Sequence, residues 1–193
     1  MNRLFIALVS LGLFATTCST VAKAEVVKQV IVDCTGKKNC FYWWPKLPAL
    51  PGWHTDEDAN FRYGGNGINT LVPDGFSFSN AETIMYANAV YKPRYIIKNP
   101  KTKNIDAYIE DDKDVYREEH KDISIAEVEP LTTGDGTKIR SSTFFRPNDK
   151  AWEQVTYYEE DDYYITFVIS SKSEKDFRTS LPVYERLIKA YKK

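Results

Sequence analysis

One histidine lies in a run of side chains that can transfer protons or bind a metal ion. His54 is part of the segment Trp53-His54-Thr55-Asp56-Glu57-Asp58, in which carboxylates follow it at two to four residues. A nearby carboxylate orients or charges an imidazole, as a general base or a metal ligand requires. The segment is therefore compatible with a small hydrolase or a metal-dependent enzyme centred on His54 with Asp56 or Asp58.

A structural role explains the same segment. No cysteine or serine of the chain has the local sequence signature of an activated nucleophile. Thr55-Asp56 is equally typical of an ordinary helix cap or turn, because short oxygen-bearing side chains accept hydrogen bonds from nearby backbone N–H groups. The sequence leaves both interpretations of His54 open.

Three tryptophans form the other candidate site. Trp43, Trp44 and Trp53 lie in a proline-rich segment, where large rigid rings can stack on a ligand or a partner at low entropy cost. The alternative is that the rings seal the open end of the core. Adjacent Trp43 and Trp44 cannot both face inward on a strand, but in irregular chain they can. The prolines favour irregular, partly polyproline chain. We expect a seal, and we keep these tryptophans and His54 as candidate binding residues.

Two cysteines in the same region predict a local disulfide. Five residues separate Cys34 from Cys40, whereas redox dithiols usually lie two residues apart and a zinc site needs two further ligands nearby. A bridge would close a small loop and contribute roughly 2 kcal/mol. We therefore predict a structural Cys34–Cys40 disulfide.

The second histidine follows an acidic run. His120 comes after residues 111–119, in which Asp114 and Glu118 would share a helical face and could present two carboxylates to a hard cation. The run lacks the ligand spacing and the central glycine of a calcium loop, and it also contains basic residues. We expect a solvated helix face with internal ion pairs, and we predict neither a metal site nor a cofactor.

The N-terminus predicts export. Residues 1–24 contain a short charged start, an apolar run from Leu4 to Phe14 and the small-x-small pattern Ala22-Lys23-Ala24, which are features of a secretory signal peptide. We place the mature start at Glu25 and the protein in a periplasm or outside the cell. Lipoprotein processing at Cys18 is the alternative, but the residues before Cys18 fit that signal poorly. No second apolar stretch approaches the ~20 residues that span a bilayer.

The charge of the mature chain argues against nucleic acid as a partner. Removal of residues 1–24 takes away two basic residues and no acidic one, which leaves 24 basic and 27 acidic residues and a net charge of −3. Such a chain has no basic excess with which to neutralise a row of phosphates. Its 169 residues are enough for one domain with a substantial core.

From residue 67 onward, the sequence predicts an antiparallel sheet. Runs rich in β-branched and aromatic residues alternate with turn signals such as Pro73-Asp74-Gly75 and Gly134-Asp135-Gly136. In the most regular run, alternate residues from Tyr163 to Ile169 form one apolar face. The expected strands are residues 68–72, 83–92, 123–130, 138–146, 152–159 and 162–171.

Two segments have the period of a helix. Residues 103–119 place Ile105, Tyr108, Ile109, Asp112, Val115 and Tyr116 on one stripe. The C-terminal segment begins with Ser173 as a helix cap and carries an apolar stripe from Phe177 to Tyr191. Pro182 predicts a kink or a restart capped by Ser180. The overall pattern is α+β, with helices packed on a mainly antiparallel sheet.

Two stretches resemble the PsbP-like superfamily. Leu71-Val72-Pro73-Asp74-Gly75-Phe76-Ser77-Phe78 and YYITFVISSKSEKDFRTSLPVYERLIKAY at residues 163–191 are similar to its opening segment and to its closing strand and helix. The resemblance spans residues 68–191. It implies an α/β/α sandwich in residues 67–193. The preceding segment 25–66, expected from its own residues to be irregular and disulfide-bonded, has no counterpart in that superfamily. The resemblance also implies a non-enzymatic accessory or interaction role. Fold analogy alone does not supply a function.

Two classes of function remain after the sequence alone. The favoured class is an exported, non-catalytic binding or accessory protein that recognises a protein or a small molecule through the Trp-rich segment and adjoining loops. The alternative class is the enzyme centred on His54. The two differ in whether the side chains around His54 are free to do chemistry, which their placement in the fold decides.

Overall fold

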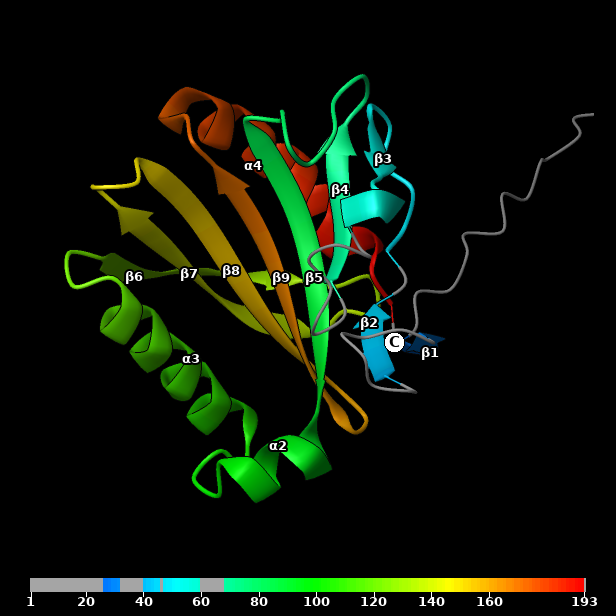
Figure 1. Ribbon diagram of the computed structural model, residues 1–193, viewed down its shortest axis with the longest axis vertical. Coiled ribbons are helices and arrows are strands. Elements are labelled where there is room, and N and C mark those ends of the chain that lie inside the picture. Colours follow the sequence, from blue (N-terminus) through cyan, green and yellow to red (C-terminus); the bar gives the residue numbers. More distant parts are fainter. Residues whose placement is uncertain (1–25, 32–39, 46, 60–67, 193) are drawn as a thin grey trace, which may run out of the picture.

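The computed structural model describes residues 26–31, 40–45, 47–59 and 68–192 (Figure 1). The predicted signal peptide, its cleavage at Glu25 and the half-cystine Cys34 lie outside these residues. The export and disulfide hypotheses therefore stay predictions.

A seven-stranded sheet forms the centre of the molecule, and each neighbouring pair of its strands is antiparallel. This confirms the predicted α+β class with a mainly antiparallel sheet. In spatial order, the strands are β3 (Trp53–Thr55), β4 (Ile68–Pro73), β5 (Thr83–Tyr91), β9 (Tyr163–Ser171), β8 (Ala151–Glu160), β7 (Lys138–Arg146) and β6 (Ser124–Thr132).

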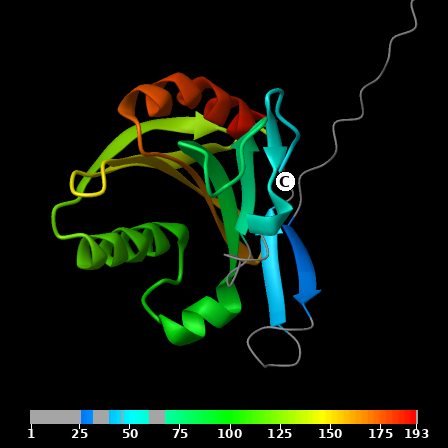
Figure 2. The same cartoon turned by 45° about the horizontal axis from the view of Figure 1, so that its top comes forward.

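Helix α4 (Glu174–Ala190) covers one face of the sheet (Figure 2). Its start is the predicted one, because the backbone N–H of Asp176 donates to Oγ of Ser173. Leu187 and Tyr184 of the predicted stripe are fully buried, in a core that includes Phe167 of β9. The helix continues through Pro182 without the predicted restart at Ser180. Buried residues before and after the proline pack on the same core, which favours one continuous helix.

Helix α3 (Ile105–Glu119) covers part of the opposite face, over a second core rich in tyrosine (Figure 2). Tyr108 and Ile109 are buried there, as the predicted stripe requires, whereas Val115 of the same stripe is exposed. Oδ1 of Asn104 accepts a hydrogen bond from the N–H of Ala107 and caps the helix.

A short helix, α2 (Lys92–Lys98), was not predicted. It begins directly after β5, with Pro93 in its first turn, where the missing proline N–H costs no helical hydrogen bond. Its seven residues are too few for the hydrophobic period to be recognised in the sequence.

The prediction that residues 25–66 are irregular is wrong for three segments. Strands β1 (Val26–Ile31) and β2 (Cys40–Pro45) form an antiparallel hairpin, and β3 joins the main sheet beside β4. The β-branched residues of β1 and the aromatic residues of β2 favour strands, and each strand gains a hydrogen-bonded partner. The prolines that suggested irregular chain lie at the end of β2 or beyond it. Since β3 pairs with β4, the domain boundary expected between residues 66 and 67 separates two neighbouring strands of the same sheet.

The hairpin is attached to the sheet by a side chain of β4. Strand β2 lies against β4 and β5, and Nδ2 of Asn69 donates a 2.8 Å hydrogen bond to the carbonyl oxygen of Pro45. Leu50, farther along, is buried in the core beneath α4. The chain that follows the hairpin therefore packs on the α4 face.

Candidate functional site

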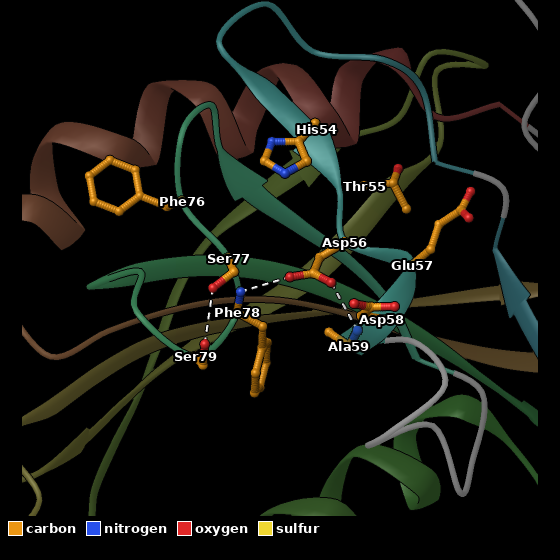
Figure 3. Close-up of a pocket in the computed structure, with 10 residues that line it drawn as sticks. All are labelled: His54, Thr55, Asp56, Glu57, Asp58, Ala59, Phe76, Ser77, Phe78 and Ser79. Carbon is orange, nitrogen blue, oxygen red and sulfur yellow. Dashed lines mark hydrogen bonds between the residues drawn. The ribbon is translucent and has the colours of Figure 1, made fainter.

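An open pocket of about 580 Å³ lies where β3 ends, opposite the loop between β4 and β5 (Figure 3). Two short segments form its lining. They are residues 54–59, which include His54 and three acidic side chains, and residues 76–79, which include two phenylalanines and two serines.

A tight turn positions the second segment. The N–H of Phe76 donates to the carbonyl oxygen of Pro73, and Gly75 has a φ of +83°, which L side chains adopt only with strain. The turn predicted from Pro73-Asp74-Gly75 is thus present. The N–H of Asp74 also donates to the carbonyl oxygen of Gly52, which ties the turn to the start of β3.

The carboxylate closest to the His54 imidazole is that of Asp74, and not that of Asp56 or Asp58 as the sequence suggested. His54 pairs with Val72 across the β3–β4 ladder, and its Nδ1 lies 3.4 Å from Oδ1 of Asp74. The His54 side chain is 46% exposed and that of Asp74 66% exposed. Solvent screens a pair of this kind strongly, so the contact holds the imidazole only weakly.

Asp56 has a structural role. Its Oδ1 accepts a 2.9 Å hydrogen bond from the N–H of Ala59, and its Oδ2 accepts one of 2.8 Å from the N–H of Phe78 (Figure 3). The carboxylate therefore caps the helical turn at residues 57–59 and joins it to the opposite wall of the pocket. The cap interpretation of Thr55-Asp56 is the one that the geometry supports.

The serines of the pocket bond to each other and to a neighbouring amide. Oγ of Ser77 lies 3.0 Å from Oγ of Ser79 and 3.2 Å from Oδ1 of Asn80. Within the described part of the chain, neither serine has a hydrogen bond to His54. Phe76 is 51% exposed, which is unusual for so large an apolar ring and leaves it available to a ligand.

Of the predicted binding tryptophans, Trp53 is described with its side chain, and it is not among the residues that line this pocket. Trp53 packs against the core beneath α4, as the seal interpretation expects. Trp43 and Trp44 belong to β2, where they pair with Lys28 and Val27 of β1. Their side chains lie outside the described part of the structure, so the seal and binding interpretations of Trp43 and Trp44 stay predictions.

A buried polar cluster on the α3 face escaped the sequence analysis. Glu153 is only 4% exposed, and its Oε1 accepts hydrogen bonds from Nη2 of Arg146 at 3.0 Å and from Oγ of Ser170 at 2.8 Å. The other guanidinium nitrogen, Nη1, lies 3.3 Å from Nε2 of His120, the residue that ends α3. Oε2 of Glu153 and Nε of Arg146 are buried and have no hydrogen-bond partner among the described residues. The sequence feature that could have indicated this cluster is Glu153, an acidic residue within the predicted strand 152–159.

A second carboxylate, on the inner side of α3, is mostly buried. Oδ2 of Asp112 accepts a 2.8 Å hydrogen bond from the Tyr157 hydroxyl. Burial is the main cause that raises the pKa of Asp112 from 3.8 to about 6. The hydrogen bond from Tyr157 lowers this pKa, and the negative charges of Asp111 and Glu153 raise it further. Part of the acidic run thus faces the sheet. Asp114 is on the solvated side, paired with Arg117 at 2.7 Å, as expected for a helix face with internal ion pairs.

Among the described residues, no cluster of three or more His, Cys, Asp or Glu side chains is arranged to hold a metal ion. Across the same residues, no helix combines the length and apolar character needed to span a bilayer.

Comparisons with known proteins give a structural likeness but no sequence relative. No protein-family model matches the sequence, and no curated protein matches it. Among solved structures, the chain is similar to a variant of the protein Mog1, with a TM-score of 0.43 and 10% sequence identity. The match covers 84% of this chain and 86% of that chain. Mog1 has the Mog1/PsbP-like fold. At this TM-score, the likeness carries no argument about function, and membership of the PsbP-like superfamily stays a prediction.

Proposed function

We propose that this protein is an exported binding or accessory protein without catalytic activity, and that the pocket beside His54 is its recognition site. The proposal rests on the hydrogen bonds of the Asp56 carboxylate. Both of its oxygens accept backbone hydrogen bonds that hold the two walls of the pocket together. A carboxylate used in this way is a poor general base, because taking up a proton would weaken both bonds.

The remaining groups of the pocket support binding in preference to chemistry. Among the described residues, the polar contact of His54 is with an exposed carboxylate, and the two serines bond to each other. A nucleophile needs an adjacent base, itself oriented by a third group, and the described lining has no such arrangement. The signal peptide predicted from residues 1–24 is the basis for export.

The lining also indicates the chemistry of the ligand. Glu57 and Asp58 are exposed on one wall of the pocket, and Phe76 presents a half-exposed ring on the opposite wall (Figure 3). A pocket with exposed carboxylates on one wall and an aromatic ring on the other favours a ligand that carries both a positive charge and an apolar group. We therefore propose that the site accepts the cationic, apolar part of a small molecule or of a partner protein.

Benzylamine tests this proposal, because it joins an aromatic ring to a single positive charge. An NMR titration of isotope-labelled protein should show backbone amide shifts concentrated at residues 54–59 and 76–79. Benzoate, which has the same ring and the opposite charge, should cause much smaller shifts. Phe76→Ser should abolish the response to benzylamine, whereas Val115→Ser, which removes an exposed apolar side chain on α3, should preserve it.

Two outcomes would overturn the assignment. Shifts of equal size with benzoate would show that the carboxylates do not select the ligand. Shifts elsewhere, or none, would show that the pocket is not a recognition site. A parallel screen with chromogenic esters, phosphate esters and glycosides addresses the enzyme alternative. An activity that His54→Ala removes would establish it.

A further inference from the structure

Helix α2 lies at the end of the sheet farthest from the pocket (Figure 1). The pocket loop leads into the start of β5, and α2 begins where β5 ends. The nine residues of β5 separate the two sites by about 30 Å, at roughly 3.3 Å per residue. Any function of α2 is therefore spatially separate from the proposed ligand site.

The two sides of α2 differ in character. On the inner side, the Tyr95 hydroxyl donates a 2.7 Å hydrogen bond to Oδ2 of Asp111, and the Tyr95 ring contacts that of Tyr108 edge-on, with centroids 5.4 Å apart. On the outer side, Arg94, Ile97 and Lys98 have the i, i+3, i+4 spacing of a single helix face. The tyrosine fixes the helix in place, so that this outer face points away from the protein.

The outer face combines an unusually exposed apolar side chain with free cations. Ile97 is 81% exposed, the largest fraction among the large apolar side chains of the described residues. Arg94 and Lys98 beside it, and Lys101 and Lys103 just after the helix, are exposed. In the described part of the chain, none of these four has a hydrogen bond or an ion pair. The stretch from residue 92 to residue 103 contains no acidic residue.

Acidic residues lie at the same end of the molecule but do not cancel this charge. Lys92 is paired with Glu159 at 2.7 Å, so these two offset each other. The β8–β9 turn adds Asp161 and Asp162, and the backbone N–H of Lys92 bonds to the carbonyl oxygen of Asp162. Asp111, bonded to Tyr95 on the inner side of α2, adds a third carboxylate. The four cations still exceed these three, on a chain that is otherwise slightly acidic.

We propose that the outer face of α2 and the residues after it bind the surface of an anionic lipid bilayer. In this arrangement Ile97 inserts between the headgroups, and the cations contact lipid phosphates. Basic side chains near an anionic bilayer contribute about 1 kcal/mol each. A projecting helix can contact a flat surface, whereas it offers no groove for an extended peptide. An acidic peptide or a nucleic acid would use the cations alone and leave Ile97 in water.

Vesicle co-sedimentation tests the proposal with the mature protein. The protein should bind vesicles of phosphatidylcholine and phosphatidylglycerol at a roughly two-to-one ratio, and should not bind phosphatidylcholine alone. Salt at roughly 0.5 M should weaken the binding by screening the cations. Ile97→Ser should lower the affinity on the order of ten-fold, and Lys98→Glu with Lys101→Glu should abolish binding.

Matched variants elsewhere on the surface separate this site from general effects. Val115→Ser removes another exposed apolar side chain, and Lys121→Glu with Lys175→Glu makes the same change of charge at other exposed positions. Both should bind like wild type. Thermal melts of every variant show whether it is folded.

Three results would overturn the proposal. The first is failure of the wild-type protein to bind anionic vesicles at low salt. The second is equal binding by the α2 variants and their controls. The third is binding to polyglutamate or duplex DNA, unaffected by Ile97→Ser, without binding to vesicles. That result would assign the surface to a soluble polyanion.

Discussion

The hydroxyl of Tyr157 donates a 2.8 Å hydrogen bond to Oδ2 of Asp112, and this bond joins the middle of α3 to a central strand of the sheet. The carboxylate lies in a tyrosine-rich interior where Glu153 adds a second negative charge. Its raised pKa makes the stability of the protein depend on pH.

Asp112→Asn should remove a pH-dependent loss of stability. The pKa of Asp112 is raised from 3.8 to about 6 on folding. The protonated carboxyl therefore contributes stability that is fully present below pH 3.8 and lost as the pH rises through about 6. The change in pKa corresponds to about 3 kcal/mol. At neutral pH, the variant should be more stable than wild type by up to this amount, in chemical denaturation repeated across pH.

Asp114→Asn is the matched control, because Asp114 lies on the solvated side of the same helix and pairs with Arg117. It should leave the pH dependence unchanged. If Asp112→Asn showed the wild-type pH dependence as well, Asp112 would not be the group responsible.

Glu153→Ala should destabilise the protein by about 3–5 kcal/mol, as loss of one partner from a buried ion pair does. Arg146 loses the carboxylate that accepts its Nη2 hydrogen bond. The double variant Glu153→Ala with Arg146→Ala should cost less than the sum of the single variants, because the two act on one interaction. Additive losses in urea denaturation would show that the pair is not coupled.

Leu187→Ala should cost about 2–5 kcal/mol, because Leu187 of α4 is fully buried against the sheet and the substitution leaves a cavity. Lys189→Ala, on the exposed side of the same helix, should change the stability by less than about 0.5 kcal/mol. Equal stabilities for the two variants in thermal or chemical denaturation would contradict the packing of α4 on the sheet.

Asp56→Ala should destabilise the protein by about 1–3 kcal/mol, because two backbone N–H groups lose their acceptor. His54→Ala should change the stability by less than about 0.5 kcal/mol, since His54 is exposed. Thermal melts of the two variants show whether the Asp56 carboxylate has a structural role. An Asp56→Ala variant as stable as wild type would instead favour a catalytic role for Asp56.

The parts of the fold that were predicted correctly depend on local sequence. Strand β9 follows from its alternation between Tyr163 and Ile169, and the start of α4 follows from Ser173 as a cap. Strand β2 was missed because the prolines near Trp43 and Trp44 outweighed the strand preference of the aromatic residues. The pairing with β1 that stabilises β2 is a tertiary interaction, which a propensity cannot reveal.

The candidate sites were predicted less completely, because their geometry comes from distant parts of the chain. His54 was identified from its neighbours, yet the carboxylate beside it is Asp74, brought there by the β3–β4 pairing. The cluster around Glu153 combines residues of β7, β8 and β9 with the end of α3. Only the fold brings these side chains together.

The most direct test of the proposed binding role is a pull-down with residues 25–193 as bait, from extracts of the cell that produces the protein. Wild type, Phe76→Ser and Val115→Ser are compared, with the retained molecules identified by mass spectrometry. The proposed function predicts that wild type and Val115→Ser retain the same specific partner and that Phe76→Ser loses it. Retention of that partner by all three baits, or the absence of any specific partner, would contradict recognition through the pocket beside His54.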